Sequence, residues 1–147
     1  MRNRRLWVMG IAGMLLVIAF SSSGVAARIL DSSVCASYTL ATGRTSTGGS
    51  SLYGNFHFLV EKGTHLTMYT LLGFLLLGLY SEWPERRWVY TLATGFAVGI
   101  SSELLQFAFP GRDPAVRDVL INFTGTILGA LLFTLLSQTR SLTVTAR

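Results

Sequence analysis

A set of polar side chains that could bind a ligand or transfer protons stands at helical spacing in an otherwise apolar chain. Lys62, His65 and Tyr69 are spaced i, i+3 and i+7, which places them on one face of a helix. The stretch from Glu103 to Gly129 holds the others, on both sides of a Pro-Gly-Arg turn. The predicted ligand-binding set is Lys62, His65, Tyr69, Glu103, Gln106, Arg112, Asp118 and Asn122.

The chemistry of this set favours recognition of a mixed polar headgroup. Arg112 and Lys62 can hold a phosphate or carboxylate through charge-assisted hydrogen bonds. The carboxylates and amides can take hydroxyl or amide groups, as in a sugar or a peptide. The alternative is a membrane enzyme, with His65 as general acid or base and Glu103 or Asp118 orienting it. No motif fixes a reaction type, so a binding protein is favoured, and a structural membrane subunit is a further alternative.

The composition indicates that lipid surrounds much of the chain. Of its 147 residues, 50% are hydrophobic and 13% are charged, and the mean hydropathy is +0.50. Soluble domains carry about a quarter charged residues. The net charge of +5 does not indicate a nucleic-acid partner, because the basic residues stand in small groups at the edges of apolar segments.

The apolar runs predict an all-α polytopic membrane protein, a small bundle of four transmembrane helices in the single domain 1–147. A helix needs about 20 apolar residues to cross a bilayer. The expected spans are about 6–27, 62–80, 88–107 and 118–138, with a flexible external loop over 28–61. The alternative for the first span is a secretory signal cleaved after Ala27.

Two of these spans must take in ionisable groups to reach full length. Residues 66–81 and 88–102 are the longest stretches there without charge or histidine. His65 and Glu103 therefore belong to the outer turns of the second and third spans. At that depth a functional role is the default expectation for an ionisable side chain.

The lysines and arginines predict which side of the membrane faces the cytoplasm. With four spans, seven of the twelve fall on the side of both termini and five on the other side. Both termini are therefore expected to be cytoplasmic. The second span then begins, the third ends and the fourth begins at the external face. The polar set is expected to meet there, in one extracytoplasmic site.

Glycine stripes are expected to bring the helices together. Gly95 and Gly99 share a face with Glu103 on the third span, and Gly125 and Gly129 form a second stripe on the fourth. A Gly-x-x-x-Gly pattern lets helix backbones approach closely in lipid. If the two stripes face each other, their packing brings the polar ends of both spans together.

No metal or cofactor is expected. His57 precedes the second span and could join His65 in a two-histidine centre, yet no ligand spacing supports one. Cys35 is the only cysteine, so an intrachain disulfide is impossible. The expected partners are the lipid bilayer and a lipid-linked envelope precursor, and a homo-oligomer is left open.

Two stretches resemble the signatures of VanZ-like membrane proteins. EKGTHLTMYTLLGFLL carries a Lys-x-x-His-x-x-x-Tyr pattern. ELLQFAFPGRDPAVRDVLINFTGTILG carries Glu-x-x-Gln, a Pro-Gly-Arg turn and Asp-x-x-x-Asn-x-x-Gly. The serine-rich end of the first apolar run, IAFSSSG, is also similar to the family. Glu61 stands where the family often has Asp, and the loop 28–61 is longer than the family pattern.

The resemblance implies a multi-pass protein of the bacterial cytoplasmic membrane, in a family linked to teicoplanin and glycopeptide resistance. Its matching polar positions are the same eight residues that the spacing singles out. Family membership assigns none of them a catalytic role.

Overall fold

The computed structural model describes residues 2–43, 51–109 and 114–145, and every element in these ranges is helical. The helices are α1 (Arg2–Ser21), α2 (Gly24–Thr42), α3 (Ser51–Leu79), the 3₁₀ turn η1 (Tyr80–Glu82), α4 (Arg87–Gln106) and α5 (Val116–Thr145). No strand occurs among the described residues. The all-α prediction is confirmed.

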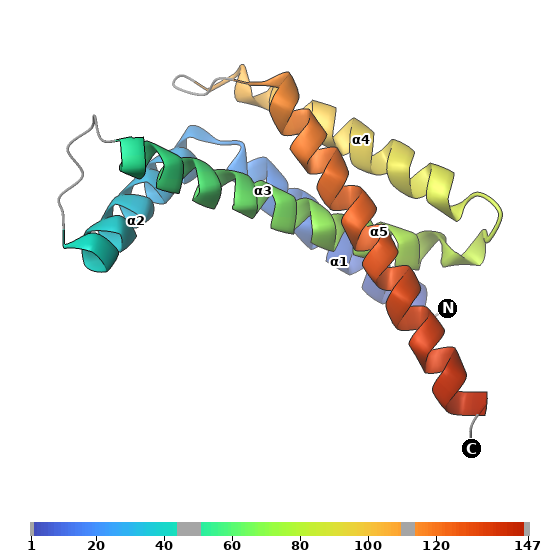
Figure 1. The fold of residues 1–147 in the computed structure, drawn as a ribbon. Coiled ribbons are helices and arrows are strands. Elements are labelled where there is room, and N and C mark those ends of the chain that lie inside the picture. The colour runs from blue at the N-terminus through green and yellow to red at the C-terminus, as the bar shows by residue number, and fades with distance from the viewer. Residues whose placement is uncertain (1, 44–50, 110–113, 146–147) are drawn as a thin grey trace.

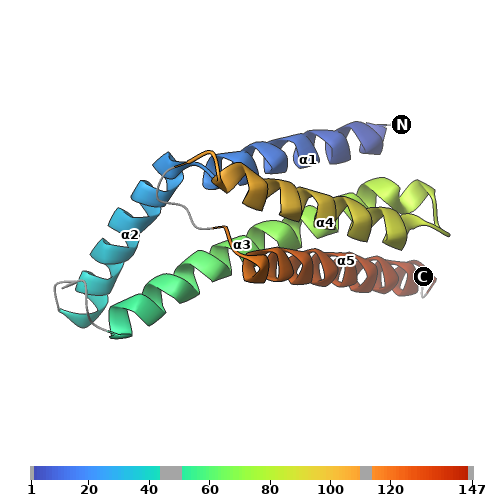
Figure 2. The ribbon, with the colours of Figure 1, turned by 90° about the horizontal axis from the view of Figure 1, so that it is seen from above.

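The long helices run back and forth, and α2 turns away from them (Figure 1, Figure 2). The start of α1, the turn between α3 and α4, and the end of α5 lie at one end of the molecule (Figure 2). The α1–α2 junction, the N-terminal half of α3, the end of α4 and the start of α5 lie at the other end, which we call the polar end. This arrangement gathers segments that are far apart in the sequence.

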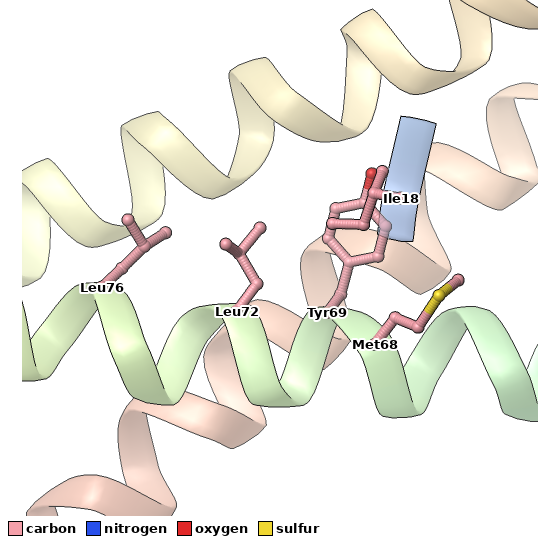
Figure 3. Packing of buried hydrophobic residues seen from close by; sticks show 5 residues of the cluster. All are labelled: Ile18, Met68, Tyr69, Leu72 and Leu76. Carbon is pink, nitrogen blue, oxygen red and sulfur yellow. The ribbon is translucent and has the colours of Figure 1, made fainter. Parts of the chain in front are cut away.

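α3 is the central helix and packs against α1, α2, α4 and α5. Its buried side chains Met68, Tyr69, Leu72 and Leu76 form a hydrophobic cluster with Ile18 of α1. Figure 3 shows these side chains along α3, with Ile18 beside the Tyr69 ring. Their spacing of i, i+1, i+4 and i+8 is that of a helix buried along one stripe. This core holds α3 in a fixed position between its neighbours.

α3 and α5 cross with their backbones in direct contact at Gly73 of α3 and at Gly125 and Gly129 of α5. A side-chain carbon added to Gly125 would lie 2.7 Å from the carbonyl oxygen of Leu66. One added to Gly129 would overlap the carbonyl oxygen of Thr70. The glycine stripe of α5 therefore lies against α3, where no residue with a side chain fits.

The glycine stripe of α4 lies against α5, but it meets side chains there and not the glycines of α5. A carbon added to Gly95 would overlap the side chain of Thr126, and one added to Gly99 would lie 3.5 Å from Asn122 Cβ. The two glycine stripes thus do not face each other. Two separate faces of α5 are used, one for α3 and one for α4, so α5 joins both helices.

The expected flexible loop over 28–61 is wrong for the described part, which is mostly helical. Ser23 caps the start of α2, its hydroxyl accepting a hydrogen bond from the Ala26 amide at 3.2 Å. Gly43 ends α2 in the left-handed conformation, with φ +65°. Residues 44–50, which hold the Gly- and Ser-rich centre of this segment, lie outside the described residues.

Aromatic packing explains why this polar-looking segment is helical. Tyr38 of α2 is buried, and its ring lies edge-on to Tyr53 of α3 with the centroids 5.3 Å apart. Val34, one turn earlier, is also buried. Helix α2 therefore follows from two good caps and a contact with α3, while its Ser, Ala and Thr content indicated a loop.

The first expected span, 6–27, ends earlier in the structure. The hydroxyls of Ser21 and Ser22 both donate to the carbonyl of Ile18, at 2.8 and 3.0 Å, and α1 ends at Ser21. Such hydroxyl bonds compete with the backbone bonds that would continue the helix.

Three helices in the described part are long and apolar enough to cross a membrane, judged on length and composition. Their apolar windows are Arg4–Ser21, Leu52–Glu82 and Val116–Gln138. Large apolar side chains are exposed on each of them, for example Leu16 at 73% and Leu135 at 60%. α4 is not among the three, because its buried stripe includes Thr91, Ser102, Glu103 and Gln106. The length and composition of these helices fit a helical membrane protein.

Candidate functional site

A buried ion pair joins α3 to the first turn of α5. Lys62 Nζ donates to Asp118 Oδ2 at 2.6 Å and to Glu61 Oε1 at 3.2 Å. The side chains of Lys62 and Asp118 are only 12% and 5% exposed. Asp118 also stands in the first turn of α5, where the helix dipole favours a negative charge. Two residues that the sequence singled out therefore meet directly.

One turn further into the molecule, His65 of α3 meets Asn122 of α5. His65 Nδ1 lies 3.1 Å from Asn122 Oδ1, and both residues are buried. Because an amide oxygen only accepts hydrogen bonds, Nδ1 carries the proton in this arrangement. The lone pair of His65 Nε2 is then left to accept a hydrogen bond.

Tyr69 continues this face of α3 and bonds to α4. Its hydroxyl lies 2.7 Å from Ser102 Oγ, and Ser102 Oγ donates to the carbonyl of Gly99 at 2.8 Å. The single hydroxyl proton of Ser102 is therefore used, so Tyr69 donates to Ser102. Tyr69 is fully buried within the hydrophobic cluster. Its place indicates a bridge between α3 and α4, two helical turns along α3 from Lys62 of the ion pair.

Glu103 and Gln106 connect the end of α4 to the start of α5. Both are buried, and Gln106 Nε2 donates to Glu103 Oε1 at 3.3 Å. Glu103 Oε2 accepts a hydrogen bond from the Ala115 amide at 3.4 Å, just before α5 begins. Glu103 thus binds the backbone at the start of α5. Arg112, the other residue expected here, lies outside the described residues.

A cavity of about 270 Å³, which we call the polar pocket, lies at the Lys62–Asp118 pair. It is lined from α2, α3, α4 and the start of α5. Its ionisable lining residues are Asp31, His57, Glu61, Lys62, Arg117 and Asp118. Gln106 adds an amide to the lining. Carboxylates and cations are mixed in this pocket, so it is suited to a ligand with both donor and acceptor groups.

Two buried polar atoms in this region make no hydrogen bond within the described structure. They are Oδ1 of Asp118, a residue that lines the polar pocket, and Nδ2 of Asn122, which lies beside His65. Arg117 Nε lies 3.8 Å from Asp118 Oδ1, which is too long for a hydrogen bond. A buried polar atom left without a partner costs about 1–3 kcal/mol, and more when it is charged. Asp118, which lines the polar pocket, therefore keeps unused acceptor capacity.

Helix α2, absent from the expected bundle, supplies the outer wall of the polar pocket. Asp31 Oδ1 of α2 lies 2.6 Å from His57 Nε2 of α3, and His57 Nδ1 lies 3.8 Å from Glu61 Oε2. The contact between His57 and Asp31 thus holds α2 against the pocket, and Glu61 lies one turn after His57 on α3. No group of three His, Cys, Asp or Glu side chains arranged for a metal ion occurs in the described part of the chain.

Sequence reasoning missed Ser102 and Asp31 as members of the polar end. Ser102 stands beside Glu103 and three residues after Gly99, so its position on the glycine stripe was the available signal. Asp31 gave no such signal, because α2 was expected to be a loop. Of the eight predicted residues, the structure brings seven to the polar end, paired between helices or stacked one turn apart.

A family model described as VanZ/LLP1 matches residues 6–137. This range covers all of the signature residues and extends from α1 to α5. The search of curated proteins and the search of solved structures found no significant match.

Proposed function

The chain belongs to the VanZ/LLP1 family, and from this premise we propose that it binds the headgroup of a lipid-linked envelope precursor. The protein is a multi-pass protein of the bacterial cytoplasmic membrane in this proposal, with four spans and both termini inside. The polar pocket is its extracytoplasmic binding site. Lys62 and Arg117 bind acidic groups of the ligand, while Asp118 and Gln106 form hydrogen bonds with its hydroxyl or amide groups.

One observation carries the proposal: the carboxylate of Asp118 is buried, lines the polar pocket and keeps one oxygen without a hydrogen-bond donor. A purely structural ion pair is stable when its remaining lone pairs are satisfied. Asp118 Oδ1 instead accepts from a hydroxyl, amide or ammonium group of the ligand. The third proton of Lys62 Nζ is left for a phosphate or carbonyl oxygen, since two are used by Asp118 and Glu61.

The other end of the molecule supports the proposed orientation. Arg4 lies 5.8 Å from the ring centroid of Trp83, and Trp83 packs with Tyr80 and Tyr90 in an aromatic cluster. Arginine is typical of the cytoplasmic side of a membrane protein, and Trp and Tyr are typical of both membrane interfaces.

The orientation predicts the labelling of single cysteines placed in a Cys35→Ser background. Val116→Cys, at the polar end, should react with a membrane-impermeant thiol reagent in intact cells. Ser81→Cys, in η1, should react only after the membrane is permeabilised. Both positions are exposed, so a difference between them reports the side of the membrane. Labelling of Val116→Cys only after permeabilisation would contradict the proposed topology.

A second function is supported by His65. Its Nδ1 is held by Asn122, so Nε2 has the free lone pair that a general base needs. In that case the protein is an enzyme that acts on the bound lipid. The family's link to teicoplanin resistance fits the first function more directly, because a held precursor headgroup is shielded from other molecules.

Lipid analysis of the purified protein tests the proposed function. Asp118→Asn keeps the side-chain shape but removes the charge, so the co-purifying ligand should fall at least about tenfold, as expected for a lost charged hydrogen bond. The exposed carboxylate of Glu85 provides a matched control, and Glu85→Gln should retain the lipid. Equal amounts of the same lipid with Asp118→Asn would contradict headgroup binding. His65→Gln separates the two functions: a binder keeps its lipid pool unchanged, whereas an enzyme accumulates its substrate in the cells.

A further inference from the structure

We infer that the protein also binds the hydrocarbon chain of the lipid ligand, in a second pocket formed by α1, α2 and α3. The inference rests on the proposed function, in which the headgroup of the lipid lies in the polar pocket. It adds the place where the hydrocarbon chain of the same lipid binds. The ligand class is therefore a lipid held by both of its parts, and not a soluble sugar phosphate or peptide.

The second pocket is an apolar cavity of about 280 Å³ at the α1–α2 junction. Val17 and Phe20 of α1, Ile29 and Leu30 of α2, and Met68 of α3 line it. We call it the apolar pocket. It exists because α1 ends at Ser21 and α2 leaves at an angle, so that the two helices diverge over α3 (Figure 2).

The two pockets are adjacent, because Leu30 and Glu61 line both of them. One pocket is rich in charge and the other is lined mainly by hydrocarbon. A single molecule that fills both must be polar at one end and apolar at the other. This continuity with the polar pocket identifies the occupant as the chain of the same lipid.

A hydrocarbon chain is flexible and can follow the lining from the apolar pocket to the adjacent polar pocket, whereas a protein helix is a rod about 10–12 Å wide. A hydrocarbon chain is much thinner than a helix. Burial of its apolar surface contributes roughly 0.8 kcal/mol per methylene group relative to water.

His65 gives the apolar pocket one polar contact. The residue lines this pocket, and its Nδ1 is bonded to Asn122 on the side of α5. Its Nε2 has no hydrogen-bond partner among the described residues. A donor group at the junction of chain and headgroup is the part of a lipid that lies closest to such a site. If the protein only binds the lipid, His65 therefore positions the ligand. If the protein is an enzyme, His65 lies close to the group that reacts.

Photo-crosslinking at Phe20 tests the inference. The photoreactive residue p-benzoyl-phenylalanine is placed at Phe20, in the apolar pocket, and separately at Phe107, an exposed aromatic at the same end of the molecule and outside both pockets. Membranes of intact cells are irradiated, and the adducts are identified by mass spectrometry. Position 20 should capture a restricted set of lipids, enriched over the bulk membrane composition, while position 107 captures the bulk lipids. Both residues are exposed, Phe20 at 55% and Phe107 at 73%, so each position has room for the added benzoyl group.

The outcomes separate failure of the inference from failure of the proposed function. Identical adducts at positions 20 and 107, or a crosslink to a second copy of the chain at position 20, would overturn the chain pocket. Asp118→Asn should return the adducts at position 20 toward bulk composition. If the enrichment at position 20 persists unchanged with Asp118→Asn, the chain pocket stands and headgroup binding in the polar pocket is refuted.

Discussion

Lys62→Met should lower the free energy of unfolding by about 3 kcal/mol, at the low end of the cost of breaking a buried ion pair. The variant leaves Asp118 buried, with neither carboxylate oxygen bonded to Lys62. The low end applies because the polar pocket adjoins the pair and lets the carboxylate reach other polar groups. In thermal unfolding of the purified protein, Tm should fall by on the order of 10 °C.

The double variant Lys62→Met with Asp118→Leu should recover most of that stability and still lose the lipid. Replacing both members of a buried pair with apolar side chains is often neutral or stabilising. Stability and ligand retention would then separate in one protein, which shows that the pair is kept for binding. A double variant as unstable as Lys62→Met would contradict this reasoning and favour the structural-subunit alternative.

Arg117→Met is the matched control for the same chemical change. The Arg117 side chain is 64% exposed and lies 3.8 Å from Asp118, so it forms a surface pair worth at most about 1 kcal/mol. Its loss should leave Tm nearly unchanged. An equal loss of stability in Arg117→Met and Lys62→Met would mean that burial of the pair is not the cause.

The spacing of polar residues correctly predicted which side chains gather at one end of the molecule. It was less successful in predicting the individual hydrogen-bond partners. Lys62 and His65 were placed on one face of α3 by helical periodicity, and the structure shows that face against α5. The partners, Asp118 and Asn122, are one turn apart on α5, so each turn of one helix meets a turn of the other. The helical period and the expected topology were sufficient to predict that these two helix faces lie together.

The register between helices could not be predicted from spacing. It depends on the backbone contacts at Gly125 and Gly129, and a Gly-x-x-x-Gly pattern does not identify the helix that it faces. The expected facing of two glycine stripes failed for this reason, because α5 turns a different face toward α4. Ser102 was missed as the partner of Tyr69 for the same reason.

Helix α2 shows a second limit of the sequence pattern. Composition separates apolar spans from polar segments, but a short amphipathic helix that packs on another helix has the composition of a loop. Its signals were the aromatic residue Tyr38, which the structure buries, and the two caps at Ser23 and Gly43. Because α2 was expected to be a loop, the site predicted from the sequence lacked the wall that α2 gives to both pockets. The polar residues were predicted, but the pockets around them were not.

Among the glycines that the structure describes, Gly129→Ala should be the glycine-to-alanine change with the largest effect. The added carbon would overlap the carbonyl oxygen of Thr70, a backbone atom that cannot rotate away. Helices α3 and α5 must then move apart, at a cost of about 1–3 kcal/mol or more for overpacking. The separation also lengthens the Lys62–Asp118 and His65–Asn122 contacts, so lipid retention should fall together with Tm.

Gly63→Ala provides the matched control on α3, the helix that Gly129 of α5 packs against. Nothing lies within 4 Å of a carbon added at Gly63, and the residue is exposed on α3. Alanine is preferred to glycine in a helix by up to about 1 kcal/mol, so this change should leave Tm unchanged or raise it. A lower Tm for Gly129→Ala together with a higher Tm for Gly63→Ala would establish that the contact between Thr70 and Gly129 sets the distance between α3 and α5. If Gly129→Ala were tolerated as well as Gly63→Ala, the helices would not be in backbone contact there, and the pairing of residues across the polar end would need another cause.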